Sequence, residues 1–204
     1  MPRNVTWPLL LLASVCSTTA AGAPLQLGTQ ELPPYSYTNE HGQADGLAVS
    51  VVRCALAAIE EPYEIQIRPW ARTQLMVQRG ELDGFFAASY AEERENYAQL
   101  SAIIAPQQWR WYLLKDSQWE PGSATFKTQA RVSAYLGTNM LNWLLSNQYN
   151  VQPAPARQAQ LLKMLQMDRL DAVLANNLVM EKILREAGGE AHVRSVLLED
   201  KPLG

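Results

Sequence analysis

The stretch over 68–94, RPWARTQLMVQRGELDGFFAASYAEER, constrains the fold of this chain more than any other part of its sequence. It predicts a helix over 71–79 that ends at Gly80, because glycine readily adopts the left-handed conformation that closes a helix. An apolar strand over 82–88 follows, and a polar turn then ends in Arg94. A helix that leads into a buried strand and opens onto polar side chains predicts one wall of a small-molecule cleft.

Strands and helices alternate upstream of this stretch as well. The segments 25–30 and 63–67 alternate apolar and polar residues, as strands do. Between them a helix is predicted by apolar residues at helical spacing, Leu47, Val51, Ala55 and Ile59. The order strand, helix, strand, helix, strand favours an α/β layer with parallel strands.

Downstream, the alternation starts again after a strand predicted over 107–115. The later segments are strands over 132–136, 149–152, 170–175 and 193–198 and helices over 139–148, 158–167 and 177–187. Leu82 and Asp83 also have counterparts in Leu170 and Asp171, at the same place in the pattern. This echo predicts two similar α/β lobes with a cleft between them. We expect each Leu to enter a sheet core and each Asp to cap its turn.

Composition restricts the class of protein. Of 204 residues, 48% are hydrophobic and 18% are charged, which is typical of a globular chain. A net charge of -3 disfavours a nucleic-acid partner, which would leave a basic footprint. His41 and His192 lie far apart, and the sequence has no phosphate-binding glycine loop, so we expect neither a metal nor another cofactor.

The first residues, 1–22, have the pattern of a secretory signal peptide, in which Arg3 precedes an apolar run and small residues follow. We therefore expect a mature protein that is exported to the periplasm and has no membrane span. Cys16 lies inside this leader, as apolar filler or as a lipid-attachment site, although Val15 before it fits the second interpretation poorly. Export leaves Cys54 as the single cysteine, and we expect it to pack in the core.

Candidate binding residues follow the predicted strands, because ligands of open α/β sheets bind outside the carboxyl ends of the strands. By position alone these candidates are Tyr35, Tyr37, Trp70, Ser89, Arg94, Thr138, Asn139, Asn176 and Asn177. Arg94 either clamps a carboxylate with two parallel hydrogen bonds, beside the Ser89 hydroxyl, or forms an ion pair with a glutamate of its own turn.

The other candidates also have two interpretations each. Thr138 and Asn139 stand at a predicted helix start, where unpaired amides suit an anion, but ordinary N-capping is the simpler explanation. Trp70 and the pair Tyr35 and Tyr37 either stack on a ligand or pack within a lobe.

Catalysis has weaker support in the sequence, because no catalytic motif stands out. Asp45, Glu92 and Glu93 fall in loops near the expected cleft, but solvated loop charge is the better interpretation of them. The aromatic residues within 109–112 are interpreted as hinge and interlobe packing on a strand that crosses between the lobes.

Five segments carry a resemblance to a known family: GTQELPPYSY, ADGLAVSVV, the stretch over 68–94, YLGTN and LQMDRLDAVLANN. They are similar to the periplasmic solute-binding proteins of the polar amino-acid (family 3) type, the substrate-binding domains of ABC transporters. The resemblance runs from about Leu25 to the end of the chain. It implies an α/β fold of the two-lobed, type II periplasmic-binding-protein class with a central cleft.

The resemblance also implies roles for single residues. Trp70 matches the ligand-stacking aromatic of the family. Ser89 and Arg94 match the residues that hold the α-carboxylate of the ligand. Thr138 and Asn139 match the helix start of the second lobe, which meets the same carboxylate.

Other positions depart from the family pattern. Asn176 falls where amino-acid binders carry an aspartate for the α-ammonium, and a neutral amide cannot neutralise that charge. The second stacking aromatic falls near Leu32, although Tyr35 is close, and Ala91 stands where a threonine is common. The ligand implied is a small polar solute, amino-acid-like and carboxylate-bearing, and the departures put an amino acid itself in question.

The resemblance divides the chain into segments, namely a signal peptide (1–22), lobe 1 (24–109), a crossover (110–116), lobe 2 (117–195) and a return crossover (196–204). The family adds further elements to its first lobe after that return, so lobe 1 is expected to be C-terminally truncated. Such a truncation would uncover apolar sheet surface and lower the stability of the chain.

The function implied is that of an exported solute-binding protein. It would act as a monomer and deliver its ligand to an inner-membrane ABC transporter permease, or report it to a sensor. The alternative is a periplasmic enzyme on the same scaffold, dehydratase-like or peptidoglycan-cleaving, which would need an acid or a base aimed into the cleft.

Overall fold

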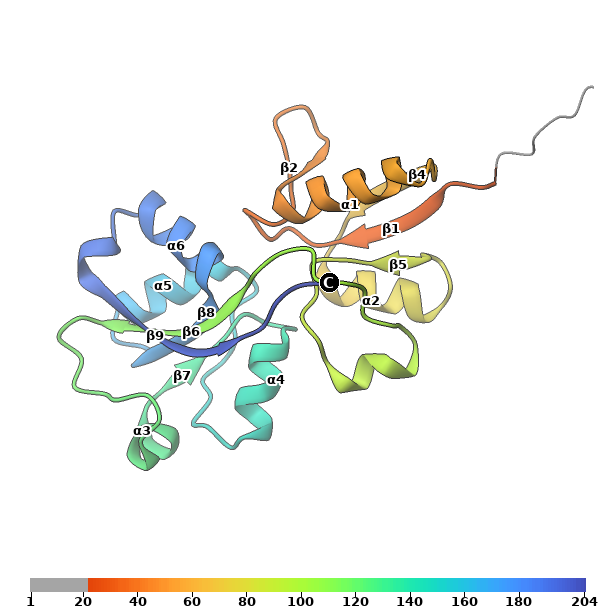
Figure 1. Cartoon of the computed structure of the whole chain (residues 1–204). Coiled ribbons are helices and arrows are strands. Elements are labelled where there is room, and N and C mark those ends of the chain that lie inside the picture. The colour runs from red at the N-terminus through yellow and green to blue at the C-terminus, as the bar shows by residue number, and fades with distance from the viewer. Residues whose placement is uncertain (1–21) are drawn as a thin grey trace, which may run out of the picture.

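The computed structural model describes residues 22–204, so Cys16 and all of the expected signal peptide except Gly22 lie outside the described residues. The described part of the chain forms two lobes, each built around its own β-sheet (Figure 1). No helix in this part is long and apolar enough to cross a membrane.

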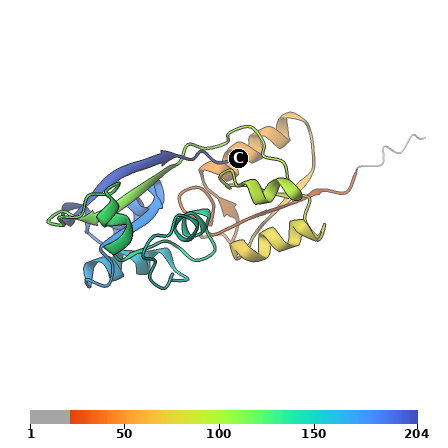
Figure 2. The same cartoon turned by 90° about the horizontal axis from the view of Figure 1, so that it is seen from below.

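Lobe 1 contains a three-stranded parallel sheet in the order β4-β1-β5. Its elements are β1 (Leu25–Thr29), β2 (Tyr37–Thr38), β3 (Ala44–Asp45), α1 (Leu47–Ala58), β4 (Tyr63–Ile67), α2 (Trp70–Gln78), β5 (Gly84–Phe85) and the 3-10 helix η1 (Glu92–Asn96). The helices α1 and α2 lie on opposite sides of the sheet (Figure 2, orange and yellow). The expected strand–helix–strand–helix–strand unit is therefore present, with the hairpin of β2 and β3 inserted before α1.

Lobe 2 contains a four-stranded mixed sheet in the order β7-β8-β6-β9, in which β6 is antiparallel to both of its neighbours. Its elements are β6 (Gln108–Leu114), α3 (Ala124–Gln129), β7 (Val132–Ser133), α4 (Asn139–Ser146), α5 (Gln158–Gln166), β8 (Ala172–Asn176), α6 (Asn177–Glu186), the 3-10 helix η2 (Glu190–His192) and β9 (Val193–Asp200). The strand expected over 149–152 is reduced to a single bridge between Val132 and Val151.

The core of lobe 2 has two halves, one on each face of its sheet. Helices α3 and α4 cover one face, where Phe126 and Leu144 are fully buried. Helices α5 and α6 cover the other, where Leu161 and Met180 are buried. Every residue of the central strand β8 is buried as a result, which explains why its first four residues form a continuous apolar run without alternation.

The aromatic residues near the start of β6 belong to lobe 2 and do not form a hinge. Because side chains alternate along a strand, Trp109 and Trp111 enter the core on the α3 and α4 face, and Tyr112 enters the opposite half. The strand pairs with β8 and β9 along its length, so it is part of the lobe 2 sheet. The expected interlobe packing is therefore corrected for Trp111 and Tyr112, whereas Trp109 also lies at the boundary between the lobes.

The two crossings between the lobes lie closer to the lobe 1 side than expected. The first falls at 105–107 and the second at 201–203, and they hydrogen-bond to each other: Leu203 N donates to Ala105 O at 2.9 Å, and Lys201 N donates to Gln107 O at 2.9 Å. The expected ranges, 110–116 and 196–204, coincide largely with β6 and β9. Lobe 2 therefore begins near Gln108, because sheet pairing holds both strands in it.

Two equivalent aspartates, one in each lobe, explain the repeated Leu-Asp pattern of the sequence. Asp83 Oδ2 accepts a hydrogen bond from Gln26 N at 2.7 Å, and Asp171 Oδ2 accepts one from Arg131 N at 2.6 Å. In return, the backbone amide of each aspartate donates to the carbonyl of the same partner. Each aspartate therefore ties its strand to the start of the neighbouring strand, instead of capping only its own turn. Leu82 and Leu170 are buried, as expected.

Helix α1 presents the opposite face from the one we expected. Its buried residues are Ala48 and Val49, whereas Leu47, Val51 and Cys54 are exposed. The expectation that Cys54 packs in the core is wrong. The helix is apolar on almost all sides, so helical spacing alone does not show which face turns inward.

Candidate functional site

A cavity of about 40 Å³ lies between the two lobes, and it brings together six of the nine candidate binding residues, whereas Tyr35, Tyr37 and Asn177 do not line it. These six residues are Trp70, Ser89, Arg94, Thr138, Asn139 and Asn176. The first three come from lobe 1 and the last three from lobe 2, so the cavity exists only where the lobes meet.

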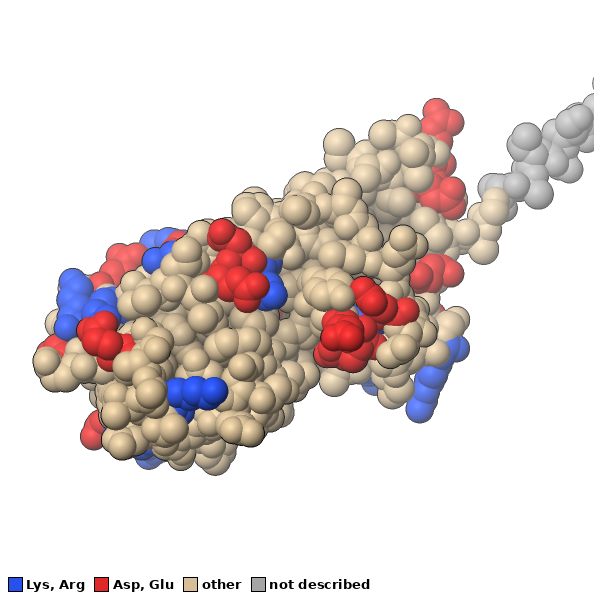
Figure 3. Space-filling view, turned by 60° about the horizontal axis from the view of Figure 1, so that its bottom comes forward, with Lys and Arg blue, Asp and Glu red and all other residues tan. Residues whose placement is uncertain are grey.

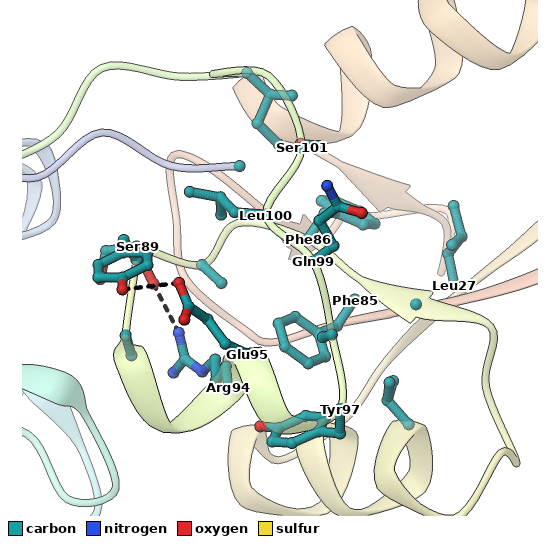
Figure 4. Close-up of a pocket in the computed structure, with 18 of the residues that line it drawn as sticks. Leu27, Phe85, Phe86, Ser89, Arg94, Glu95, Tyr97, Gln99, Leu100 and Ser101 are labelled. Carbon is teal, nitrogen blue, oxygen red and sulfur yellow. Dashed lines mark hydrogen bonds between the residues drawn. The ribbon is translucent and has the colours of Figure 1, made fainter.

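Arg94 is the charged residue of this cavity, and it is 8% exposed. Its Nε donates to Gln74 Oε1 at 3.1 Å, and its Nη1 donates to Ser89 O at 2.7 Å (Figure 4). Its Nη2 donates across the lobe boundary to Asn139 Oδ1 at 2.9 Å. The guanidinium also lies over the Trp70 ring, 5.2 Å from its centroid. A guanidinium has five N–H donors, so these bonds leave two for a ligand.

Arg94 forms no ion pair with any carboxylate of the described residues. The glutamates of its turn, Glu92, Glu93 and Glu95, are exposed, because η1 points Arg94 inward and turns the others to solvent. Glu95 instead accepts a hydrogen bond from the Tyr90 hydroxyl at 2.9 Å. The sequence left open whether Arg94 pairs with one of these glutamates or serves a ligand, and the structure contains no such pair.

Burial lowers the pKa of Arg94, although a guanidinium stays protonated at neutral pH. A buried cation is costly unless a negative charge or several hydrogen bonds compensate it. Here three neutral acceptors and an aromatic face compensate it in part. An anion in the cavity would complete that compensation.

Asn139 joins the two lobes at this point. Besides accepting from Arg94, its Nδ2 donates to Ser89 Oγ at 3.0 Å. Its side chain therefore forms hydrogen bonds with Arg94 and Ser89, the two residues that we expected to bind a ligand carboxylate. Thr138, one residue earlier, caps α4: its Oγ1 accepts from Leu141 N at 3.3 Å. This hydrogen bond is the one that the N-capping interpretation of Thr138 predicts.

Tyr35 does not reach the cavity. It is fully buried in the core of lobe 1, and its hydroxyl donates to Pro106 O at 2.9 Å. Its loop is tied to the start of α1, because Ala48 N donates to the Tyr35 carbonyl at 2.9 Å. Gly46 permits that approach, since a Cβ there would lie 2.5 Å from the same carbonyl oxygen. Leu32, where the resemblance places the second aromatic, lines the cavity instead.

Asn176 ends β8 and is 5% exposed. Among the buried side-chain nitrogen and oxygen atoms of the described residues, its Oδ1 is the one that lacks a hydrogen-bond partner. Buried polar atoms normally have a partner, and a functional site is a common reason for an exception. Asn176 lines the interlobe cavity, so a donor on a ligand is one candidate partner for this acceptor.

Sequence reasoning missed two glutamines that line the cavity, Gln30 and Gln107. Gln107 Oε1 accepts from the indole of Trp109, which also lines the cavity, at 3.1 Å. Gln30 directly follows β1, so the rule that selected the other candidates would have found it if the strand had been ended one residue earlier. Gln107 was assigned as the first residue of a strand, but it precedes β6.

A larger and more apolar groove, about 760 Å³ in volume, lies within lobe 1 beside β5 (Figure 4). Leu27, Phe85, Phe86, Leu100 and Ile104 are among its lining residues. Arg94 and Ser89 stand in the wall between this groove and the interlobe cavity. We take the smaller cavity as the candidate site, because it collects polar side chains from both lobes.

The surface charges fit a small-molecule site better than a nucleic-acid interface. On the face shown in Figure 3, lysines and arginines are scattered in small groups, and acidic side chains lie among them. No continuous basic patch forms on that face, whereas a nucleic-acid interface normally has one.

No protein-family model and no curated protein matches this sequence. Its fold, however, matches solved structures closely. A histidine kinase sensor domain with similarity to periplasmic binding proteins shares 16% identity at a TM-score of 0.77, over 90% of this chain and 82% of that one. The GluR0 ligand-binding core from Nostoc punctiforme in complex with L-glutamate shares 18% identity at a TM-score of 0.73, over 88% of this chain and 84% of that one.

A third match is the substrate-binding protein of an amino-acid ABC transporter, with 15% identity and a TM-score of 0.70, over 89% of this chain and 84% of that one. Sequence identities this low establish the fold alone. The chain therefore has the two-lobed α/β fold of the periplasmic-binding-protein class, and the expected fold class is confirmed.

Proposed function

We propose that this chain is an exported solute-binding protein that captures a small carboxylate-bearing solute between its two lobes. The observation that carries the proposal is Arg94, a buried cation in the interlobe cavity without a carboxylate partner among the described residues. Bidentate pairing with a carboxylate is the interaction for which a guanidinium is best shaped.

The geometry suits a ligand that replaces the Asn139 side chain. A carboxylate beside Arg94 would take over the bond that Nη2 now donates to Asn139 Oδ1, and it would also use the free N–H groups. Ser89 Oγ, released from Asn139, would donate to the second oxygen. Trp70 would supply an apolar wall, since it lines the same cavity.

The matched structures support both proposed downstream partners. They include a substrate-binding protein of an amino-acid ABC transporter and a histidine kinase sensor domain. We propose that the closed, liganded form of this chain is recognised by a transporter permease or a sensor in the inner membrane. The leader pattern over 1–22 supports delivery to the periplasm.

The enzyme alternative lacks a residue to carry it in the cavity. Asp45, Glu92 and Glu93, the carboxylates considered for acid–base work, do not line the cavity. A general acid or base must lie within hydrogen-bond reach of the proton that it moves. We therefore propose binding alone.

The test is a thermal-shift and tryptophan-fluorescence screen of amino acids, other carboxylic acids and small amines. We expect carboxylates to raise the melting temperature and to change the fluorescence, because Trp70 and Trp109 line the cavity. Arg94→Ala should abolish both responses. Arg72→Ala, an exposed arginine of α2, is the matched control and should retain them.

Circular dichroism of each variant shows that it is folded, and Arg94→Lys tests whether a cation alone is sufficient. Ligand responses that persist in folded Arg94→Ala would refute the role of Arg94.

A further inference from the structure

The charge of the cavity is unbalanced. Arg94 is its one charged side chain among the described residues, and the polar ones around it are neutral. These neutral groups are Gln30, Ser89, Gln107, Thr138, Asn139 and Asn176. The nearest glutamates of η1 are exposed to solvent and form no ion pair with Arg94. The site therefore carries one positive charge, and its lining contains no carboxylate that could neutralise a second positive charge.

This imbalance distinguishes two classes of carboxylate ligand. A simple carboxylate brings one negative charge and makes the combined site neutral. A zwitterionic amino acid brings a carboxylate and an ammonium together, so one positive charge would remain enclosed between the lobes. Amide oxygens can accept hydrogen bonds from an ammonium, but they do not supply the negative charge that a buried cation needs.

Asn176 places a second, independent requirement on the chemistry of the ligand. Its Oδ1 is buried and has no donor, although the residue is only 5% exposed. Backbone pairing of Asn176 with Trp109 holds the residue in place at the end of β8. A ligand hydroxyl donates one hydrogen bond to such an acceptor without adding charge.

The cavity is also small. Its volume of about 40 Å³ is comparable to that of a few ordered waters. Displacing the Asn139 side chain enlarges the space next to Arg94, since that side chain now fills it. The solute is therefore a short one.

We infer that the interlobe cavity takes a small monocarboxylate that carries a neutral hydrogen-bond donor and no ammonium group, such as a short 2-hydroxy acid. The inference rests on the proposed function, because it assumes that the carboxylate meets Arg94. It specifies the charge class of the solute, which that proposal leaves open.

The experiment compares acids that share one carbon skeleton and differ only in hydroxyl against ammonium. The pairs are glycolate and glycine, and L-lactate and L-alanine. Calorimetric titration of the full chain should show each hydroxy acid binding about tenfold or more tightly than its amino-acid partner. Asn176→Asp supplies the missing negative charge, so it should reverse this order.

Asn177→Asp is the matched control, because it adds the same charge one residue further on, outside the lining of the cavity. The Asn177 side chain accepts from Gln108 N at 3.0 Å, and an aspartate can accept the same bond. This variant should keep the wild-type preference for hydroxy acids.

The outcomes separate the inference from the proposed function. Equal or tighter binding of the amino acids by the wild-type chain would overturn the inference alone. A preference for hydroxy acids that Asn176→Asp leaves unchanged would overturn it too. Failure of every acid in both series to bind the folded wild-type chain would overturn the proposed function together with the inference.

Discussion

At the scale of single residues, several charge-assisted hydrogen bonds of lobe 2 meet at Asp171. Arg131 bonds this carboxylate from its backbone amide, from Nε and from Nη2, at distances between 2.6 and 3.1 Å. Burial acts to raise the pKa of Asp171, but these bonds outweigh it and lower the pKa below the ordinary value. The hydrogen bonds between Arg131 and Asp171 therefore link the start of β7 to the start of β8.

Asp171→Asn should destabilise the chain by about 2 kcal/mol, because it removes charge-assisted hydrogen bonds from a largely buried carboxylate. Urea unfolding at neutral pH measures the change. Asp168→Asn is the control, since Asp168 pairs with the same Arg131 but is 87% exposed. A loss of stability in Asp168→Asn as large as that in Asp171→Asn would contradict the prediction.

The same carboxylate makes part of the stability depend on pH. Because the pKa of Asp171 is lower in the folded chain than in the unfolded one, its contribution is present above about pH 4 and is lost as the pH falls through the folded value. We expect the wild-type advantage over Asp171→Asn to shrink across that acidic range in urea unfolding. A constant difference down to the lowest pH would contradict this.

A substitution at Tyr35 tests whether this residue stabilises the fold or binds the ligand. Tyr35→Phe removes the bond from the hydroxyl to Pro106 O and should cost about 1 kcal/mol of stability. Ligand affinity should stay unchanged, since Tyr35 does not line the cavity. Thermal melting and titration with a bound carboxylate check both parts. A clear loss of affinity at unchanged stability would return Tyr35 to the binding site.

At the scale of elements, α4 contributes Asn139 to the lobe 2 side of the site. Its first residue is Asn139, and its N-cap is Thr138, whose Oγ1 also donates to Tyr135 O at 2.7 Å. The helix is anchored by Met140, Leu141 and Leu144, which are buried against the sheet. The cap and the apolar anchors together fix the direction in which Asn139 points.

Thr138→Val keeps the shape of the side chain and removes the capping hydroxyl, so it should destabilise the chain by about 1 kcal/mol. Thr138→Ser retains the hydroxyl and should lose much less. Urea unfolding of the two variants compares them directly. Equal stabilities would show that the cap contributes nothing to α4.

Elements also show where sequence patterns stop being informative. Alternation correctly predicted β1 and β4, because a half-buried strand repeats every second residue. The spacing of Leu47, Val51 and Ile59 correctly predicted α1, but it marked the exposed face. The choice between the faces of an apolar helix depends on the sheet against which it packs, and a local pattern does not contain that information.

At the scale of the whole molecule, the Asn139 side chain links the two lobes by hydrogen bonds. It bonds Arg94 and Ser89 of the other lobe, while the chain crosses between the lobes at 105–107 and 201–203. A hinge of two short segments permits rigid-body motion of the lobes. A ligand carboxylate and Asn139 would therefore compete for the same groups, while Val179 of α6 adds apolar contact between lobe 2 and the core of lobe 1.

Asn139→Ala should shift the ligand-free chain toward more open arrangements, which small-angle scattering detects as a larger radius of gyration. Asn142→Ala, one turn further along α4 and exposed, is the control and should scatter like the wild type. Scattering by ligand-free Asn139→Ala that matches the wild type would show that these bonds do not hold the lobes together.

The sequence by itself determined the alternation of strands and helices, the two lobes and the positions that follow the strands. These features are local, because periodicity and turn chemistry are written in neighbouring residues. On that basis it placed Trp70, Ser89, Arg94, Thr138, Asn139 and Asn176 at one cleft, and the structure brings these six together. The paired aspartates, Asp83 and Asp171, were likewise recognisable from their repeated context.

Only the tertiary structure decided which partner each side chain meets. It placed Tyr35 in a core, turned Cys54 to solvent and assigned β6 to lobe 2. It also left Arg94 without a carboxylate among the described residues and Asn176 without a donor. These outcomes depend on contacts between segments that are distant in the chain, since burial and charge balance belong to the packed molecule.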